Sequence, residues 1–161
     1  MIVTSRAMPL MSFFRIVLVL LSCAAAGPVF AQDGPAHVEI VDAWARVALT
    51  STETSAYVSI VNRGGEDDHL ISVSSPVAAA AELQKIGGWG FTMKPKVVEN
   101  LKIPAASVVK LKPGRTFIHV TGLTEKLEPG RSLPLALRFE KTGTLYVDAE
   151  ISNQELGNRG R

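Results

Sequence analysis

The chain has 161 residues, with 17 Lys and Arg residues against 15 Asp and Glu residues. Arg6 and Arg15 are the only charged residues before Gln32, so the rest of the chain carries 15 charges of each sign and no formal net charge. This balance gives nucleic-acid binding no electrostatic support. The length that follows residue 31 predicts a single domain.

Residues 1–31 predict an export signal. Arg6 and Arg15 give it a basic start, residues 16–27 form a short apolar run, and residues 29–31 supply small side chains at the two positions that a signal peptidase reads. The run is shorter than the ~20 residues that a membrane-spanning helix needs. The sequence therefore predicts a cleaved signal peptide and a periplasmic protein that begins at Gln32 and lacks a transmembrane segment.

A lipoprotein signal is the alternative reading of the same segment. Residues 20–23 read Leu-Leu-Ser-Cys, an imperfect lipobox that would leave Cys23 lipidated as the first residue. Cys23 is also the only cysteine of the chain, so the exported domain is predicted to have no disulfide and no thiolate. Met93 is the only sulfur-containing residue after the signal.

From His37 onward the chain is predicted to form short strands, because no segment sustains the 3.6-residue apolar period of a long amphipathic helix. Residues 78–81 could begin a helix, but Pro76 and the Gly87-Gly88 pair leave it too short, and a strand is predicted there. The predicted strands are Val38–Val47, Ala56–Asn62, His69–Ser74, Ala80–Ile86, Ser107–Leu111, Thr116–Leu123, Leu133–Glu140 and Leu145–Ile151.

Turn-forming residues separate these strands at residues 62–65, 87–90, 113–114 and 129–130. Eight short strands with regular turns predict an antiparallel β-sandwich. The domain is predicted to cover residues 32–151, and residues 152–161 to form a polar C-terminal tail.

Four segments resemble, in order, the periplasmic copper chaperones of the PCu(A)C family. They are Asp42–Arg46, Ala56–Asn62, the stretch from Leu101 to Gly114, and Phe139–Gly143. The segment Leu111–Leu123 resembles the copper-site strand of that family. The resemblance covers residues 42–151 and implies a cupredoxin-like antiparallel Greek-key β-sandwich, a single domain that agrees with the predicted strands.

The resemblance also implies a Cu(I) site of two His and two Met residues, spaced as His, ten residues, Met, twenty-one residues, His, one residue, Met. Soft thioethers and imidazoles suit Cu(I). The same spacing falls here on Gln84, Pro95, Phe117 and His119. Every slot has changed type, because a glutamine, a proline and a phenylalanine replace three ligands and a histidine replaces a methionine.

A rebuilt two-ligand site is the remaining metal hypothesis. Met93 lies two residues before the Pro95 slot, and a shift of two preserves the strand face, so its sulfur could approach His119. His119 and Met93 are thus the candidate metal ligands, and Cu(I) is the candidate ion. The alternative is that Met93 packs in the core. His69, which follows Asp67 and Asp68, is better explained as part of a solvated loop.

Two functions follow. The first is an exported copper chaperone-like protein, whose partner would be a copper-accepting subunit of a respiratory oxidase or another periplasmic protein, with a degenerate metal site. The second is a non-metal binding module in which Trp89, Phe91 and Phe117 contact a protein or a small ligand. An enzyme is not predicted, because the domain has no cysteine nucleophile, phosphate loop or nucleophile elbow.

Overall fold

The computed structural model describes residues 34–47, 52–88 and 93–152. The chain divides into two compact units, residues 1–31 and residues 32–161. The predicted signal, Cys23, Trp89, Phe91 and the tail from residue 153 lie outside the described residues.

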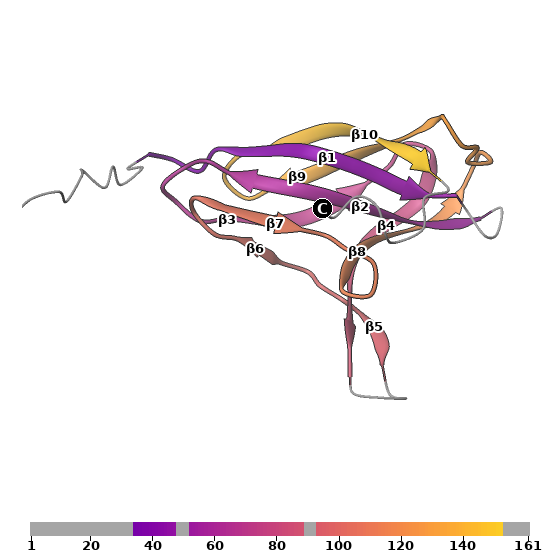
Figure 1. The fold of residues 1–161 in the computed structure, drawn as a ribbon, viewed down its shortest axis with the longest axis horizontal. Helices are drawn as coiled ribbons and strands as arrows, with labels where there is room; N and C mark the ends of the chain where they lie inside the picture. The colour runs from indigo at the N-terminus through magenta and orange to yellow at the C-terminus, as the bar shows by residue number, and fades with distance from the viewer. Residues whose placement is uncertain (1–33, 48–51, 89–92, 153–161) are drawn as a thin grey trace, which may run out of the picture. The chain divides into compact units, whose positions relative to one another are not determined.

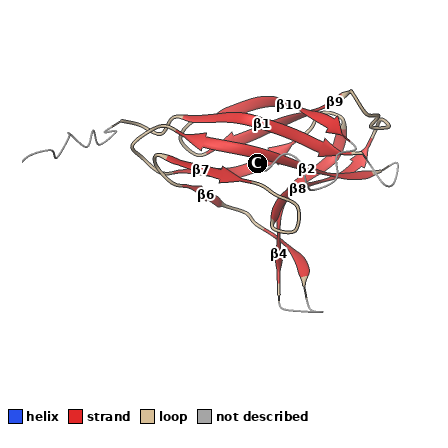
Figure 2. Cartoon of the chain, in the orientation of Figure 1, coloured by secondary structure: helices blue, strands red, loops and turns tan. Residues whose placement is uncertain are grey.

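Every regular element of the described residues is a β-strand (Figures 1 and 2). The strands are β1 Val38–Arg46, β2 Glu53–Asn62, β3 Asp68–Ser74, β4 Ala78–Gly87, β5 Lys94–Val97, β6 Leu101–Ile103, β7 Ser107–Lys110, β8 Thr116–Leu123, β9 Ser132–Phe139 and β10 Thr144–Ser152. All eight predicted strands are present, with ends that differ by up to three residues. The short strands β5 and β6 were not predicted.

The strands follow one hydrogen-bonded path, in the order β5-β4-β8-β2-β1-β10-β9-β3-β6, with β7 paired to β2. The strand pairs are antiparallel, as predicted, except that β1 and β10 pair in parallel. On its other side, β1 pairs antiparallel with β2, and β10 pairs antiparallel with β9. A parallel contact therefore joins the two halves of the path.

A single hydrophobic core fills the space enclosed by this path. Eight strands contribute buried apolar side chains, as the alternation of apolar and polar residues predicts for strands with one wet face. In β9 the inward residues are Leu133, Leu135, Leu137 and Phe139, which are at most 2% exposed. The residues between them are more exposed, so one face of this strand packs in the core and the other faces outward.

Two buried polar side chains tie the connection between β2 and β3 to the core. The amide of Asn62 donates to the carbonyl oxygens of Glu66 and Ile103, and its oxygen accepts from the backbone N–H groups of His37 and Gly64. The carboxylate of Asp68 accepts from the backbone N–H groups of His69, Lys141 and Thr142 and from the Thr142 hydroxyl. Both groups are buried and fully hydrogen-bonded, so their burial is compensated.

We expect Asp68→Asn to lower the free energy of unfolding at neutral pH by about 3 kcal/mol. The groups around Asp68 are all N–H and O–H donors, and the NH2 group of an asparagine would face some of them as a further donor. Burial alone would raise the pKa of Asp68, but the hydrogen bonds from Thr142 and the backbone outweigh it and lower the pKa below the ordinary 3.8. The stabilisation by this carboxylate should therefore be complete above pH 3.8 and be lost as the pH falls through the lower folded-state pKa.

Urea unfolding followed as a function of pH measures both effects. The matched control is Asp67→Asn, which changes a neighbouring carboxylate that is exposed and bound to Lys102 and the Ala105 N–H. Equal losses in the two variants would contradict the assignment of a special role to Asp68.

Candidate functional site: the outer face of β4, β5 and β8

The pairing of β4 with β8 decides which side chains point outward. Leu83 is paired with Ile118, and both are buried in the core. Because side chains alternate along a strand, the next pair, Gln84 with Phe117, points to the opposite face. The pair Glu82 with His119 lies on that same outer face.

The pairing of β4 with β5 adds the remaining slot. Gln84 is paired with Val97, and Ile86 is paired with Pro95, so Pro95 shares the outer face with Gln84. The four positions that correspond to the PCu(A)C ligands, Gln84, Pro95, Phe117 and His119, thus lie on one face of three neighbouring strands. The register therefore brings these four positions onto a common surface.

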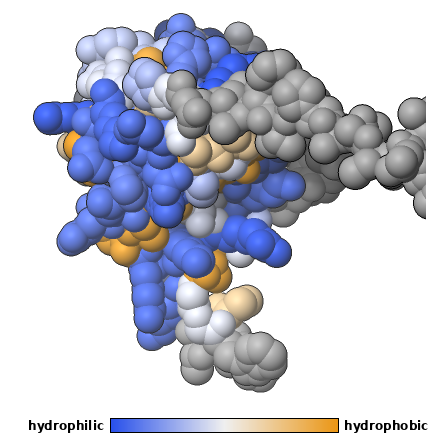
Figure 3. Space-filling model, turned by 90° about the vertical axis from the view of Figure 1, so that its left-hand side faces the viewer, coloured by the Kyte–Doolittle hydropathy of each residue, from blue (hydrophilic) through white to orange (hydrophobic). Residues whose placement is uncertain are grey.

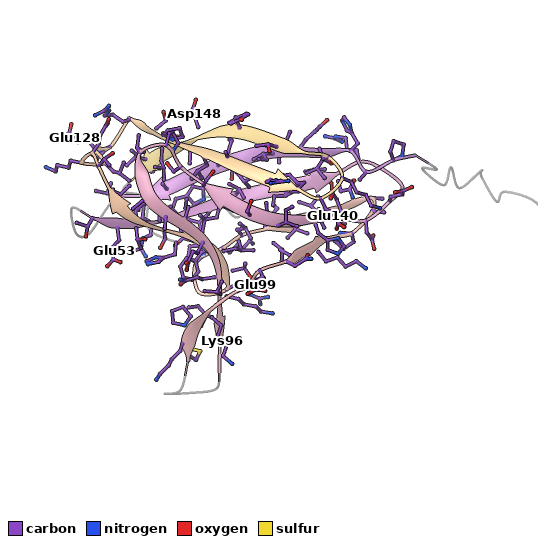
Figure 4. All side chains as sticks on the ribbon, turned by 180° about the vertical axis from the view of Figure 1, so that it is seen from behind. Glu53, Lys96, Glu99, Glu128, Glu140 and Asp148 are labelled. Carbon is purple, nitrogen blue, oxygen red and sulfur yellow. The ribbon has the colours of Figure 1, made fainter. Side chains whose placement is uncertain are left out.

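The surroundings of His119 contain carboxylates rather than sulfur. Its Nε2 lies 3.5 Å from Oε2 of Glu53, which is more than half exposed. Its ring meets the ring of Phe117 edge to face, with 6.3 Å between the centroids. Glu82 is its direct cross-strand partner on β4. Figure 4 shows Glu53 at the surface, on a different part of the molecule from Lys96 of β5.

The chemistry of the four slots is therefore mostly non-ligating. Gln84 offers an amide oxygen, Pro95 and Phe117 offer no ligand atom, and His119 alone offers a ring nitrogen. Within residues 34–47, 52–88 and 93–152, no three His, Cys, Asp or Glu side chains are grouped so that they could hold a metal ion. Among these four positions, the His119 imidazole is the one side chain suited to a soft metal ion.

Met93 is exposed and lies at the far end of the β4–β5 hairpin from His119. Its side chain is 61% exposed, which does not agree with packing in the core. It precedes Lys94, the partner of Gly87, whereas the partner of His119 is Glu82. Five strand positions separate Gly87 from Glu82, roughly 16 Å at 3.3 Å per residue. The register does not bring Met93 alongside His119.

The other two histidines lie beside other carboxylates. His69 Nδ1 lies 3.0 Å from Glu140, and the carboxylates that precede it are occupied, Asp68 by the backbone and Asp67 by Lys102. His37 Nε2 lies 3.2 Å from Glu39. The three histidines contact different carboxylates in different parts of the fold.

Sequence reasoning missed the two carboxylates next to His119. Glu53 begins β2 three residues before the predicted start of that strand, and its position beside His119 depends on the register between β2 and β8. The alternation of side chains along β4 indicates that Glu82 points outward. Its position beside His119 follows only from the pairing of residue 82 with residue 119, which the sequence does not show.

Comparisons with known proteins agree on the family and the fold. A family model described as "LpqE-like: Putative lipoprotein LpqE-like" matches residues 38–151. "Putative lipoprotein Lxx21020" of Leifsonia xyli subsp. xyli (strain CTCB07) is 28% identical in an alignment over 157 residues, which covers 93% of this chain and 92% of that protein.

Solved structures of PCuAC domains have the same fold. The copper-bound PCuAC domain from PmoF2 aligns with a TM-score of 0.62 and 23% identity, over 73% of this chain and 93% of that one. The Cu(I) form of DR1885 from Deinococcus radiodurans aligns with a TM-score of 0.57 and 24% identity, over 73% and 79%. At this identity the likeness shows the fold alone, and it confirms the predicted cupredoxin-like β-sandwich.

The outer face depends on close contact between β8 and β4, which Gly122→Ala should disrupt. Gly122 has φ +67°, and a Cβ there would lie 2.5 Å from the Cβ of Ala79. We expect Gly122→Ala to lower the free energy of unfolding by about 3 kcal/mol, from the left-handed backbone and the overpacking together.

Gly114→Ala is the matched control, because Gly114 has φ +73° but open space around its Cβ position. It should lose only the backbone contribution, about 1 kcal/mol. Urea unfolding of both variants measures the difference, and equal losses would show that the contact with Ala79 is unimportant.

Proposed function

The chain belongs to the LpqE-like family, and from this membership and its PCuAC-type fold we propose that it is an exported, non-catalytic, copper chaperone-like protein with a degenerate metal site. The observation that supports the proposal most directly is the shared outer face of Gln84, Pro95, Phe117 and His119, where the ligand positions of the fold meet but only one imidazole remains.

His119 is the residue that we assign to Cu(I). A neutral imidazole binds Cu(I) without losing a proton, and the half-buried ring is accessible from the outer face. The amide oxygen of Gln84 is a hard donor that suits Cu(I) poorly. Binding through one ring nitrogen is weak, so copper held here would pass readily to a better site, such as a copper-accepting oxidase subunit or another periplasmic protein.

A second candidate, a non-metal binding module, is favoured by the apolar side chains at the vacated slots. Phe117 is half-buried on the outer face, and Val97, the β5 partner of Gln84, is 57% exposed. The other two residues predicted for this surface, Trp89 and Phe91, lie outside the described residues. In this case the face would contact a protein or a small ligand and take up no copper.

Copper titration distinguishes the two candidates. Under anaerobic conditions, with a competing chromophoric chelator, we expect the chain from Gln32 onward to take up Cu(I) weakly and His119→Ala to abolish that uptake. Met93→Leu should leave it unchanged, because the register holds Met93 away from His119. Uptake that His119→Ala leaves unchanged, or no uptake at all, would remove His119 as a ligand and favour the binding module.

A variant with the four family ligands restored is the positive control for the frame. Gln84→His, Pro95→Met, Phe117→His and His119→Met together should bind one Cu(I) far more tightly than the wild type, because soft ligands then occupy all four slots. Weak binding by a folded variant of this kind would show that the frame itself is unsuited to copper.

We also propose that the protein is exported as a lipoprotein. The family and the Leifsonia relative both carry the name "putative lipoprotein", which supports lipidation of Cys23 over cleavage after Ala31. No helix in the described residues is long and apolar enough to cross a membrane.

Expression of the full chain tests the anchor. We expect the wild type to sediment with membranes and to be labelled by a fatty-acid analogue, and Cys23→Ser to lose the label. Ser22→Ala, a neighbouring change that keeps a small residue before the cysteine, is the control and should keep the label. An unlabelled wild type whose sequence begins at Gln32 would instead establish the cleaved signal peptide.

A further inference from the structure

A hollow on the outward side of β9 and β10, which we call the Tyr146 hollow, belongs to no site described above. Its volume is about 490 Å³, within the range of sites for small molecules. Along the hydrogen-bonded path, β1 and β2 lie between these strands and the strands of the candidate site. The hollow is lined by residues of β9 and β10, by the end of β3 and by the turn after it, among them Pro134, Ala136, Tyr146, Asp148, Ser74 and Pro76.

The strand register forms the floor of the Tyr146 hollow. Ala136 is paired with Ser74 on β3 and with Tyr146 on β10, and in the next row Pro134 is paired with Asp148. Because Ala136 carries only a methyl group, the surface is lower there than at the tyrosine beside it. The floor is therefore small and apolar, and the side chains of β10 rise at one side of it.

The turn that follows β3 bounds the opposite side of the hollow. β3 ends at Ser74, and the hydroxyl of the buried Ser75 donates to the carbonyl oxygen of Pro134 at 2.7 Å. This hydrogen bond holds the turn, with the exposed Pro76, against β9. The hollow is therefore bounded on this side by backbone that the fold holds in place.

Tyr146 exposes its ring at the edge of this hollow. It is 83% exposed, the largest fraction among the exposed large apolar residues in the described part of the chain. Trp44 and Phe117 meet other rings, those of Tyr57 and His119, whereas Tyr146 meets no other ring of the described residues. Hydrophilic residues predominate on the face of the molecule that Figure 3 shows, with small apolar patches between them. An exposed aromatic ring is an attractive surface for a cation.

The carboxylate of Asp148 supplies a negative charge next to this ring. Asp148 is exposed (Figure 4) and forms no ion pair with any described residue, whereas Asp67 pairs with Lys102 at 2.7 Å. Tyr146 and Asp148 are two residues apart on one face of β10, with roughly 7 Å between their Cα atoms. One cation can therefore contact the ring and the carboxylate together.

Four other charged residues point to the same side of β1, β9 and β10. Glu150 and Asp42 are acidic and make interactions of their own, so we assign no ligand role to them. Arg46 and Arg138 are paired with positions of β10 that lie four residues from Asp148, roughly 13 Å along the strand. At that distance exposed charges are largely screened, so Asp148 remains available to a cationic ligand.

We propose that the Tyr146 hollow binds a small alkylammonium ion. The ammonium group lies on the ring of Tyr146 and pairs with Asp148, while the alkyl groups contact Ala136 and the prolines. A neutral sugar could stack on the ring but would leave the carboxylate without a partner. The volume suits a small molecule better than a segment of a protein, which would need a longer groove.

Titration with choline chloride tests the proposal, with amide chemical shifts of the chain from Gln32 onward, a compact unit, as the measurement. We expect saturable shifts at the amides of β9 and β10 around the hollow, with a Kd of about 1 mM, because one ring contact and one exposed ion pair each contribute little. Dimethylbutanol, the neutral analogue of choline in which carbon replaces nitrogen, should bind at least about tenfold more weakly.

Three variants at two exposed positions separate the ring from the charge. Tyr146→Leu and Asp148→Asn should each weaken choline binding about fivefold, and Tyr146→Phe, which keeps a ring, should bind within about twofold of the wild type. Unchanged shifts of the buried core residues check that each variant is folded. The matched control is Glu99→Gln, which removes an exposed carboxylate on a different part of the molecule (Figure 4) and should bind as the wild type does.

Four results would overturn the proposal: no saturable shift around the hollow, equal binding of the neutral analogue, unchanged affinity in both Tyr146→Leu and Asp148→Asn, or an equal loss in Glu99→Gln. Saturation of the same amides by a lysine-containing peptide at far lower concentration than by choline would also overturn it and indicate a protein partner. The titration contains no copper, and the hollow shares no residue with the site around His119, so the result is independent of the proposed function.

Discussion

The register between β4 and its neighbours is the constraint on which the rest of the structure depends. Leu83 must face the core together with Ile118, and this one requirement fixes the direction of every other side chain in β4 and β8. A slip by one residue would place Gln84 in the core and Leu83 in solvent. The candidate site is therefore positioned by apolar burial and not by any interaction among its own residues.

The same alternation explains why the hairpin has two different faces. Lys85 and Gly87 lie on the same face of β4 as the buried Leu83. At these two positions other strands no longer cover that face. The face that carries Gln84 continues as Ile86, opposite Pro95. Where β4 leaves the core, its inward face carries Lys85, opposite Lys96, and its outward face carries Ile86, opposite Pro95. The same strand is therefore cationic on one face and apolar on the other.

Much of the fold could be predicted from the sequence, because long strands such as β9 have a strong apolar alternation. β5 could not, since Lys94–Val97 contains a proline and two lysines and forms only through its pairing with β4. β6 has three residues, too few for a period to be visible. Local patterns also carry no information on which strands pair in parallel, so the parallel contact between β1 and β10 was not predicted.

The sequence could select candidate positions for a site but not the neighbours of those positions. The ligand spacing that the PCu(A)C resemblance implies selected Gln84, Pro95, Phe117 and His119, and the register places these residues on one face. The proximity of Glu53 to His119 depends on how two strands far apart in the sequence align. The separation of Met93 from His119 likewise depends on the pairing of Gly87 with Lys94, a contact that no local pattern specifies.

The apolar burial that stabilises this fold does not involve the side chains at the four candidate ligand positions. Gln84 and Phe117 are half-buried and Pro95 is exposed, and none of the four slots belongs to the buried core. Exchanging residues at such positions alters little of the apolar burial that stabilises the sandwich. The fold shared with the PCuAC domains therefore does not depend on which residues occupy these four positions. Likeness of fold and binding of copper are therefore separate properties in this architecture, because the first follows from the buried core and the second from side chains outside it.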